Sequence, residues 1–93
     1  VLYTNGNSPL STNRITATAV SKDGIWVTNY GAALSLHLLK NDNAWESFSF
    51  PFSAAQYPTD LLVDGLNQVW MILNPAQGGG LLVFDRERNE QAY

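Results

Sequence analysis

The stretch Ser21-Lys-Asp-Gly-Ile-Trp-Val-Thr-Asn-Tyr-Gly31 decides the fold. Its early part, Lys22-Asp-Gly24, is a turn signal, because Asp and Gly favour the backbone conformations of tight turns. The residues from Ile25 to Thr28 are mostly β-branched or aromatic and predict a short strand. The stretch therefore predicts a turn and the strand that follows it, which Gly31 closes.

A related stretch returns downstream as Asp64-Gly-Leu-Asn-Gln-Val-Trp-Met-Ile-Leu73. The tryptophans of the two stretches, Trp26 and Trp70, are 44 positions apart, which suits one four-stranded blade of a β-propeller. Aligning the two copies also pairs Gly31 with Gly78. We interpret the two tryptophans and the two glycines as equivalent positions of a structural repeat, with the tryptophans packing each blade.

The rest of the chain is typical of further strands separated by turn signals. We expect strands at 15–20, 25–30, 34–39 and 44–50 in the first copy, and at 59–63, around Trp70, within 78–85 and from 90 in the second. Alternation in the first strand places Ile15, Ala17 and Ala19 on one face. Leucines in 34–39 also fit a helical stripe, but the repeat sets Leu34 and Leu36 opposite Leu81 and Val83, which favours a strand.

We therefore expect an all-β protein made of about two four-stranded antiparallel blades excised from a larger β-propeller. Residues 1–7 would be the outer strand of a preceding blade with its loop, residues 8–51 one blade, and residues 52–93 the following blade with a truncated fourth strand. Two blades cannot close a ring and leave apolar faces and strand edges uncovered. Other blades of the same protein are the expected partners, and the fragment alone is expected to self-associate.

The composition excludes several classes of function. Charged residues make up 14% of the chain and its net charge is −3, so the clustered Lys and Arg of a nucleic-acid interface are missing. Cysteine is absent, which excludes disulfides and thiolate chemistry. No apolar run approaches the roughly 18 residues of a membrane-spanning helix.

The sequence contains no recognisable catalytic or metal-binding constellation. His37, the single histidine, lies in an apolar run without partners at ligand spacing, which predicts a packed or hydrogen-bonded side chain. Asp60 with Asp64, or Asp42 among asparagines, offers carboxylates without the spacing of an EF-hand loop, and turn aspartates commonly bond backbone N–H groups instead. Folding could unite Asp60 with Glu46 as a carboxylate pair, but nothing in the sequence indicates it. We predict no catalytic residues, no metal and no cofactor.

Two aromatic residues are candidates for ligand stacking. Trp45 and Tyr57 lie outside the repeated tryptophan positions, in an edge strand and in a connector. Exposed aromatic rings of this kind stack on sugars. Packing within the fold is the alternative role for both.

The segment Ser8-Pro-Leu-Ser-Thr-Asn-Arg-Ile-Thr16, followed by Asp23-Gly-Ile-Trp-Val-Thr28 and Gly31-Ala-Ala-Leu34, resembles the two-component-regulator propeller repeat of Bacteroidetes. Thr28-Asn29 stands where the family pattern has Gly-Thr, and the second copy lacks the connector motif. The second copy, with Gly78-Gly-Gly-Leu-Leu-Val-Phe-Asp85, is most similar to the surface propeller component of the type IX (Por) secretion system.

This resemblance implies a non-catalytic binding or scaffold module of a cell-surface protein that takes part in type IX secretion or cargo attachment. Its implied partners are other secretion-system components or a surface glycan such as lipopolysaccharide, at the outer membrane or in the periplasm. One alternative is the periplasmic oligosaccharide-sensing propeller of a hybrid two-component sensor. A second is a propeller lyase, which would use a metal and a histidine near the propeller axis.

Overall fold

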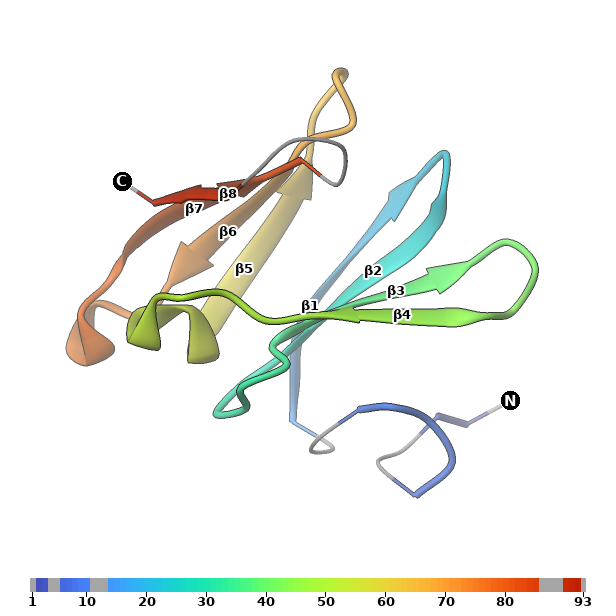
Figure 1. Ribbon diagram of the computed structural model, residues 1–93, viewed down its shortest axis with the longest axis horizontal. Coiled ribbons are helices and arrows are strands. Elements are labelled where there is room, and N and C mark those ends of the chain that lie inside the picture. Colours follow the sequence, from blue (N-terminus) through green and yellow to red (C-terminus); the bar gives the residue numbers. More distant parts are fainter. Residues whose placement is uncertain (1, 4–5, 11–13, 86–89, 93) are drawn as a thin grey trace.

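The computed structural model describes residues 2–3, 6–10, 14–85 and 90–92, and only the backbone of the last three. Its elements are β1 (Ile15–Ser21), β2 (Gly24–Asn29), β3 (Leu36–Lys40), β4 (Trp45–Phe48), η1 (Ser53–Gln56), β5 (Pro58–Val63), β6 (Val69–Leu73), η2 (Pro75–Gln77), β7 (Gly80–Phe84) and β8 (Glu90–Ala92). The strands form two sheets, β1-β2-β3-β4 and β5-β6-β7-β8, hereafter the N-terminal and C-terminal sheets (Figure 1). All strand pairs are antiparallel. The predicted all-β class with two four-stranded antiparallel sheets is confirmed.

The strand expected at 34–39 is present as β3, so the helical alternative for this leucine-rich run is wrong. The predicted turn at 86–89 lies outside the described residues. Leu2 and Tyr3 belong to neither sheet, and the Tyr3 ring packs edge-on against Trp45 at a centroid distance of 5.3 Å. The outer strand expected within residues 1–7 would belong to a preceding blade, so it stays a prediction.

The register of the strands shows that the two sheets are built alike. In each sheet the tryptophan of the second strand pairs with one residue on either side: Trp26 with Ala19 and Leu38, and Trp70 with Leu62 and Val83. A bulge interrupts the first strand pair at the corresponding place, between Ile15 and Thr18 and between Pro58 and Asp60. The equivalence of Trp26 and Trp70 therefore extends to their cross-strand neighbours.

The third strands align differently from the prediction. Leu36 of β3 lies opposite Thr28, and Leu81 of β7 lies opposite Ile72, the residue that corresponds to Thr28. Leu36 therefore corresponds to Leu81, whereas the sequence alignment had paired Leu34 with Leu81. Leu34 lies in the loop before β3. A shift of two residues keeps every side chain on the same face, so alternation of apolar residues does not reveal it.

The bulge in β1 also corrects the predicted faces of that strand. Ile15 lies opposite Asn29, and Thr16 Oγ1 lies 2.8 Å from Thr28 Oγ1 on the other face. Ile15 is therefore on the face opposite Ala17 and Ala19, because the extra residue in a bulge reverses the alternation. Sequence alternation alone had placed Ile15 beside the two alanines.

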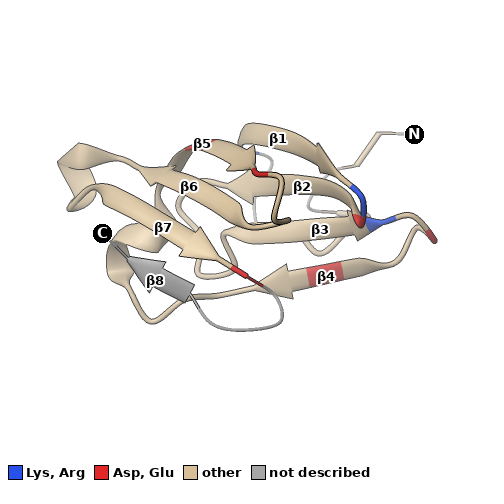
Figure 2. Cartoon of the chain, turned by 90° about the horizontal axis from the view of Figure 1, so that it is seen from above, with Lys and Arg blue, Asp and Glu red and all other residues tan. Residues whose placement is uncertain are grey.

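The core lies between the two sheets. We call the face that carries the tryptophan the front of each sheet. The front of the N-terminal sheet, with Trp26 and Leu38, packs against the back of the C-terminal sheet, with Met71, Leu82 and Phe84. Figure 2 shows the first strands, β1 and β5, along one edge of this pair and β4 along the opposite edge.

Two side-chain hydrogen bonds tie corresponding positions of the two sheets together. Asn67 Nδ2 donates to Asp23 Oδ2 at 2.7 Å between the first turns of the sheets. Asn74 Nδ2 donates to the Tyr30 hydroxyl at 2.5 Å, beyond the ends of β6 and β2. The partners in both bonds are 44 positions apart, the same separation as Trp26 and Trp70. Each repeat thus contacts its neighbour through its own equivalent residues.

We expect Trp26→Ala to lower the free energy of unfolding by about 3–5 kcal/mol, because truncating a buried aromatic residue leaves a cavity in the core. Trp70→Ala should cost clearly less, since Trp70 is only half-buried whereas Trp26 is 0% exposed. Denaturant melts of both variants measure the difference. Equal losses, or a loss below about 1 kcal/mol for Trp26→Ala, would contradict the assignment of Trp26 to the core.

Candidate functional site

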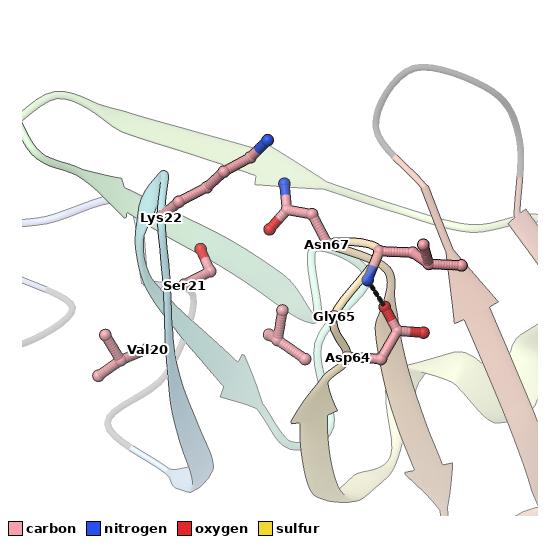
Figure 3. Close-up of a pocket in the computed structure, with 8 residues that line it drawn as sticks. Val20, Ser21, Lys22, Asp64, Gly65 and Asn67 are labelled. Atoms are coloured by element: carbon pink, nitrogen blue, oxygen red, sulfur yellow. Dashed lines mark hydrogen bonds between the residues drawn. The ribbon is translucent and has the colours of Figure 1, made fainter.

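The hollow at one end of the sheet pair is the candidate site. It lies between the β1–β2 turn and the β5–β6 turn and has a volume of about 460 Å³ (Figure 3). Eight residues line it: Val20, Ser21, Lys22, Val63, Asp64, Gly65, Leu66 and Asn67. Because both walls are turns at the ends of packed strands, the core fixes their separation while their tips face solvent.

Asp64 holds the wall formed by the C-terminal sheet. Its Oδ1 accepts hydrogen bonds from the backbone N–H groups of Leu66 and Gln68, and its Oδ2 accepts one from Trp70 Nε1 at 2.7 Å. These donors stabilise the carboxylate, with Trp70 the largest contributor, and lower the pKa of Asp64 below its ordinary value. The predicted role of Asp64 as a turn aspartate that bonds backbone N–H groups is confirmed.

Ser21 has the same role on the other wall. Its Oγ accepts hydrogen bonds from Trp26 Nε1 at 3.1 Å and from the backbone N–H of Asp23 at 3.2 Å. Ser21 and Asp64 each follow directly after the corresponding residues Val20 and Val63. In both sheets, therefore, the residue at the turn accepts the indole N–H of the repeated tryptophan. Neither contact was predicted from the sequence.

Lys22 and Asn67 supply the polar groups that remain directed at the hollow. Figure 3 shows their side chains extending toward one another from the two turns. Lys22 is exposed, and one Asn67 amide hydrogen is already donated to Asp23. Leu66, which is 79% exposed, adds apolar surface at the rim, whereas the Val20 side chain points away from the hollow. An ammonium, an amide and nearby apolar side chains together suit a ligand with both polar and apolar faces.

His37 is not part of this hollow. It is 0% exposed, and its ring nitrogens contact Ser47 Oγ at 2.8 Å (Nδ1) and Asn29 Oδ1 at 3.0 Å (Nε2). Burial lowers the pKa of His37 below its ordinary value of 6.5. The prediction of a packed, hydrogen-bonded histidine is confirmed. Among the described residues, no three His, Cys, Asp or Glu side chains come together as a metal site.

The two candidate stacking residues lie apart from the hollow and from each other. Trp45 begins β4, is half-buried and contacts Tyr3 and His37 edge-on. Tyr57 follows η1, is half-buried and packs edge-on against Tyr30 at 5.4 Å. Both rings therefore have packing partners, and their role in ligand stacking stays a prediction.

Gly31 and Gly78 both follow the second strand of their sheet and both have positive φ, 78° and 104°. This conformation favours glycine at each position. Gly31 N donates to the carbonyl of Gln56, whereas Gly78 is the C-cap of η2. The two glycines share a positive φ, but η2 separates Gly78 from β6 and their hydrogen bonds differ.

No known protein family, curated protein or solved structure matches this chain. Within the described residues, no helix has the length and apolar character needed to cross a membrane.

We expect Asp64→Ala to destabilise the protein at neutral pH, because three N–H donors lose their acceptor. Asp64→Ser should retain more of the stability, since a serine hydroxyl holds the indole of Trp26 in the N-terminal sheet. The lowered pKa of Asp64 means that its contribution is complete at neutral pH and is lost as the pH falls through the folded-state value. Thermal melts at pH 7 and pH 3 measure this, and a deficit of Asp64→Ala that is unchanged at pH 3 would contradict it.

We also expect the stability of the protein to fall as the pH decreases below about 6.5. The unfolded chain protonates His37 at its ordinary pKa, whereas burial lowers the pKa in the folded state, so acid favours unfolding. His37→Gln retains hydrogen-bonding groups but does not titrate, and should flatten the profile between pH 7 and 5.5. Equal slopes for the two proteins in denaturant melts would contradict this assignment.

Proposed function

We propose that this chain is a non-catalytic binding and scaffold module of the β-propeller kind, in which the two sheets are neighbouring blades. The observation that carries the proposal is the front-to-back packing of two sheets that share strand order, bulge position and tryptophan register. Stacking of such repeats about an axis is how propellers are built. Turns at the ends of the strands then present the binding surface.

The state of the titratable side chains supports a binding role over the lyase alternative. Both ring nitrogens of His37 are engaged by Asn29 and Ser47, and the ring is sealed from solvent. The Asp64 carboxylate already accepts three hydrogen bonds. A general base must reach the proton that it abstracts, and His37 has no such access.

We further propose that the ligand of the hollow is a carbohydrate. Lys22 and Asn67 offer donors for sugar hydroxyl or acidic groups, while Leu66 and Val63 offer apolar surface for the C–H faces of a sugar ring. The resemblance to the secretion-system propeller supports a setting at the cell surface, with lipopolysaccharide as the glycan. In that setting the module would attach or deliver secreted cargo.

This proposal is tested by NMR titration of the chain with the delipidated core oligosaccharide of lipopolysaccharide. We expect shift changes confined to the β1–β2 and β5–β6 turns. Lys22→Ala should weaken binding about tenfold, since it removes a charge-assisted hydrogen bond. Lys40→Ala is the matched control, because it removes the same charge from β3, outside the hollow.

Equal effects of Lys22→Ala and Lys40→Ala, or no shift changes, would overturn the assignment of the hollow. Shift changes centred on Trp45 or Tyr57 would instead assign the glycan to the aromatic residues that the sequence singled out.

A further inference from the structure

The contact between the two sheets of one chain shows which surfaces of this repeat fit together. The front of the N-terminal sheet is covered by the back of the C-terminal sheet, so Trp26 reaches Phe84 at a ring-centroid distance of 6.2 Å. The corresponding front of the C-terminal sheet, which carries Trp70, faces away from this contact. So does the back of the N-terminal sheet.

These two outer faces carry much of the exposed apolar surface of the molecule. On the front of the C-terminal sheet, Leu62 and Ile72 are 63% and 50% exposed. On the back of the N-terminal sheet, Val20 and Ile25 are 80% and 41% exposed and pair with each other across β1 and β2. Both patches therefore lie on the first two strands of their sheet. The same strands bring the sheets of one chain together, through β1 and β5.

We infer that the front of the C-terminal sheet is the docking surface for the back of the N-terminal sheet of a second copy of this chain. The resulting association is head-to-tail and follows, at the turn end of the sheets, the front-to-back arrangement already present within one chain. It rests on the proposed function only in treating the two sheets as stacked repeats. A heterologous contact of this kind leaves one face open at each end of the pair and so admits further copies.

The register specifies which residues meet in this contact. Phe84 and Leu39 correspond, since they lie opposite the equivalent residues Val69 and Ile25. Trp70 would therefore contact the cross-strand pair Ile25–Leu39 of the second copy. Within one chain, Trp26 contacts Phe84 of the equivalent pair Val69–Phe84.

Much of this back face is already covered within the chain: Trp45 packs against Tyr3, and Val27, Asn29 and His37 are at most 9% exposed. The contact therefore uses the turn end of β1 and β2, where Val20 and Ile25 are exposed.

The turns add a polar contact to the same arrangement. Within one chain, Asp23 accepts a hydrogen bond from Asn67, its counterpart in the next sheet. Across the new contact, Asp23 of the second copy would lie next to Asn67, as Asn67 lies next to Asp23 within one chain. This arrangement brings the Asn67 amide close to the Asp23 carboxylate of the second copy, at equivalent positions of their turns.

The test uses sedimentation velocity of the 93-residue chain with the variants Leu62→Glu and Val20→Glu. We expect the parent to associate beyond the dimer as its concentration rises. Each variant alone should require at least about tenfold higher concentration, because association would bury an unpaired carboxylate. Leu34→Glu is the control, because Leu34 is 39% exposed and lies in the loop between β2 and β3, outside the hollow and both faces. Circular dichroism melts check that the variants fold.

Mixing the two variants gives the decisive result. Leu62→Glu retains an intact back face and Val20→Glu an intact front face, so the mixture should form a dimer that grows no further. A parent chain that stays monomeric overturns the inference, as does a Val20→Glu variant that still dimerises while Leu62→Glu does not, since that result indicates front-to-front pairing. Glycan binding without assembly leaves the proposed function standing, and assembly without glycan binding leaves this inference standing.

Discussion

The burial of Trp26 between the two sheets is the interaction on which the rest of the structure depends. Its indole contacts Phe48 and Phe84, one from each sheet, at centroid distances of 5.6 and 6.2 Å. A single four-stranded sheet of this length has no core of its own, so each sheet is stabilised by covering the other. The Ser21 hydroxyl satisfies the indole N–H, which removes the cost of burying it unpaired. The same packing holds the two turns that form the hollow at a fixed separation.

The two repeats share a backbone but differ in chemistry where their surroundings differ. Position His37 of the N-terminal sheet corresponds to Leu82, and Asn29 corresponds to Leu73. Leu82 and Leu73 lie on the face that is buried in the core between the sheets, and both are apolar. His37 and Asn29 lie on the outer face and satisfy one another by hydrogen bonding. The same strand geometry therefore accommodates an apolar pair or a hydrogen-bonded polar pair, provided that each buried polar group has a partner.

Much of the fold could be predicted from local signals. The turn at Asp23, the β-prone residues around Trp26 and the 44-residue spacing to Trp70 were sufficient for two antiparallel sheets. The bulge that reverses Ile15 could not be predicted, because a bulge changes side-chain faces without a required residue type. The alignment of Leu36 with Leu81 could not be predicted for a related reason. A displacement of two residues leaves the alternation of apolar and polar side chains unchanged. The hollow forms only when two turns distant in sequence are brought together by packing.

The two turns that form the walls of the hollow differ in length. In the N-terminal sheet two residues, Lys22 and Asp23, separate β1 from β2, whereas residues 64–68 separate β5 from β6. The longer turn is organised by the Asp64 carboxylate, which accepts two backbone N–H groups there in addition to the indole of Trp70. Ser21, with a single oxygen, suits the shorter turn. The strands of the two sheets match, but the turns that follow them differ. The two walls of the hollow are therefore dissimilar, and two equivalent sheets form an asymmetric site.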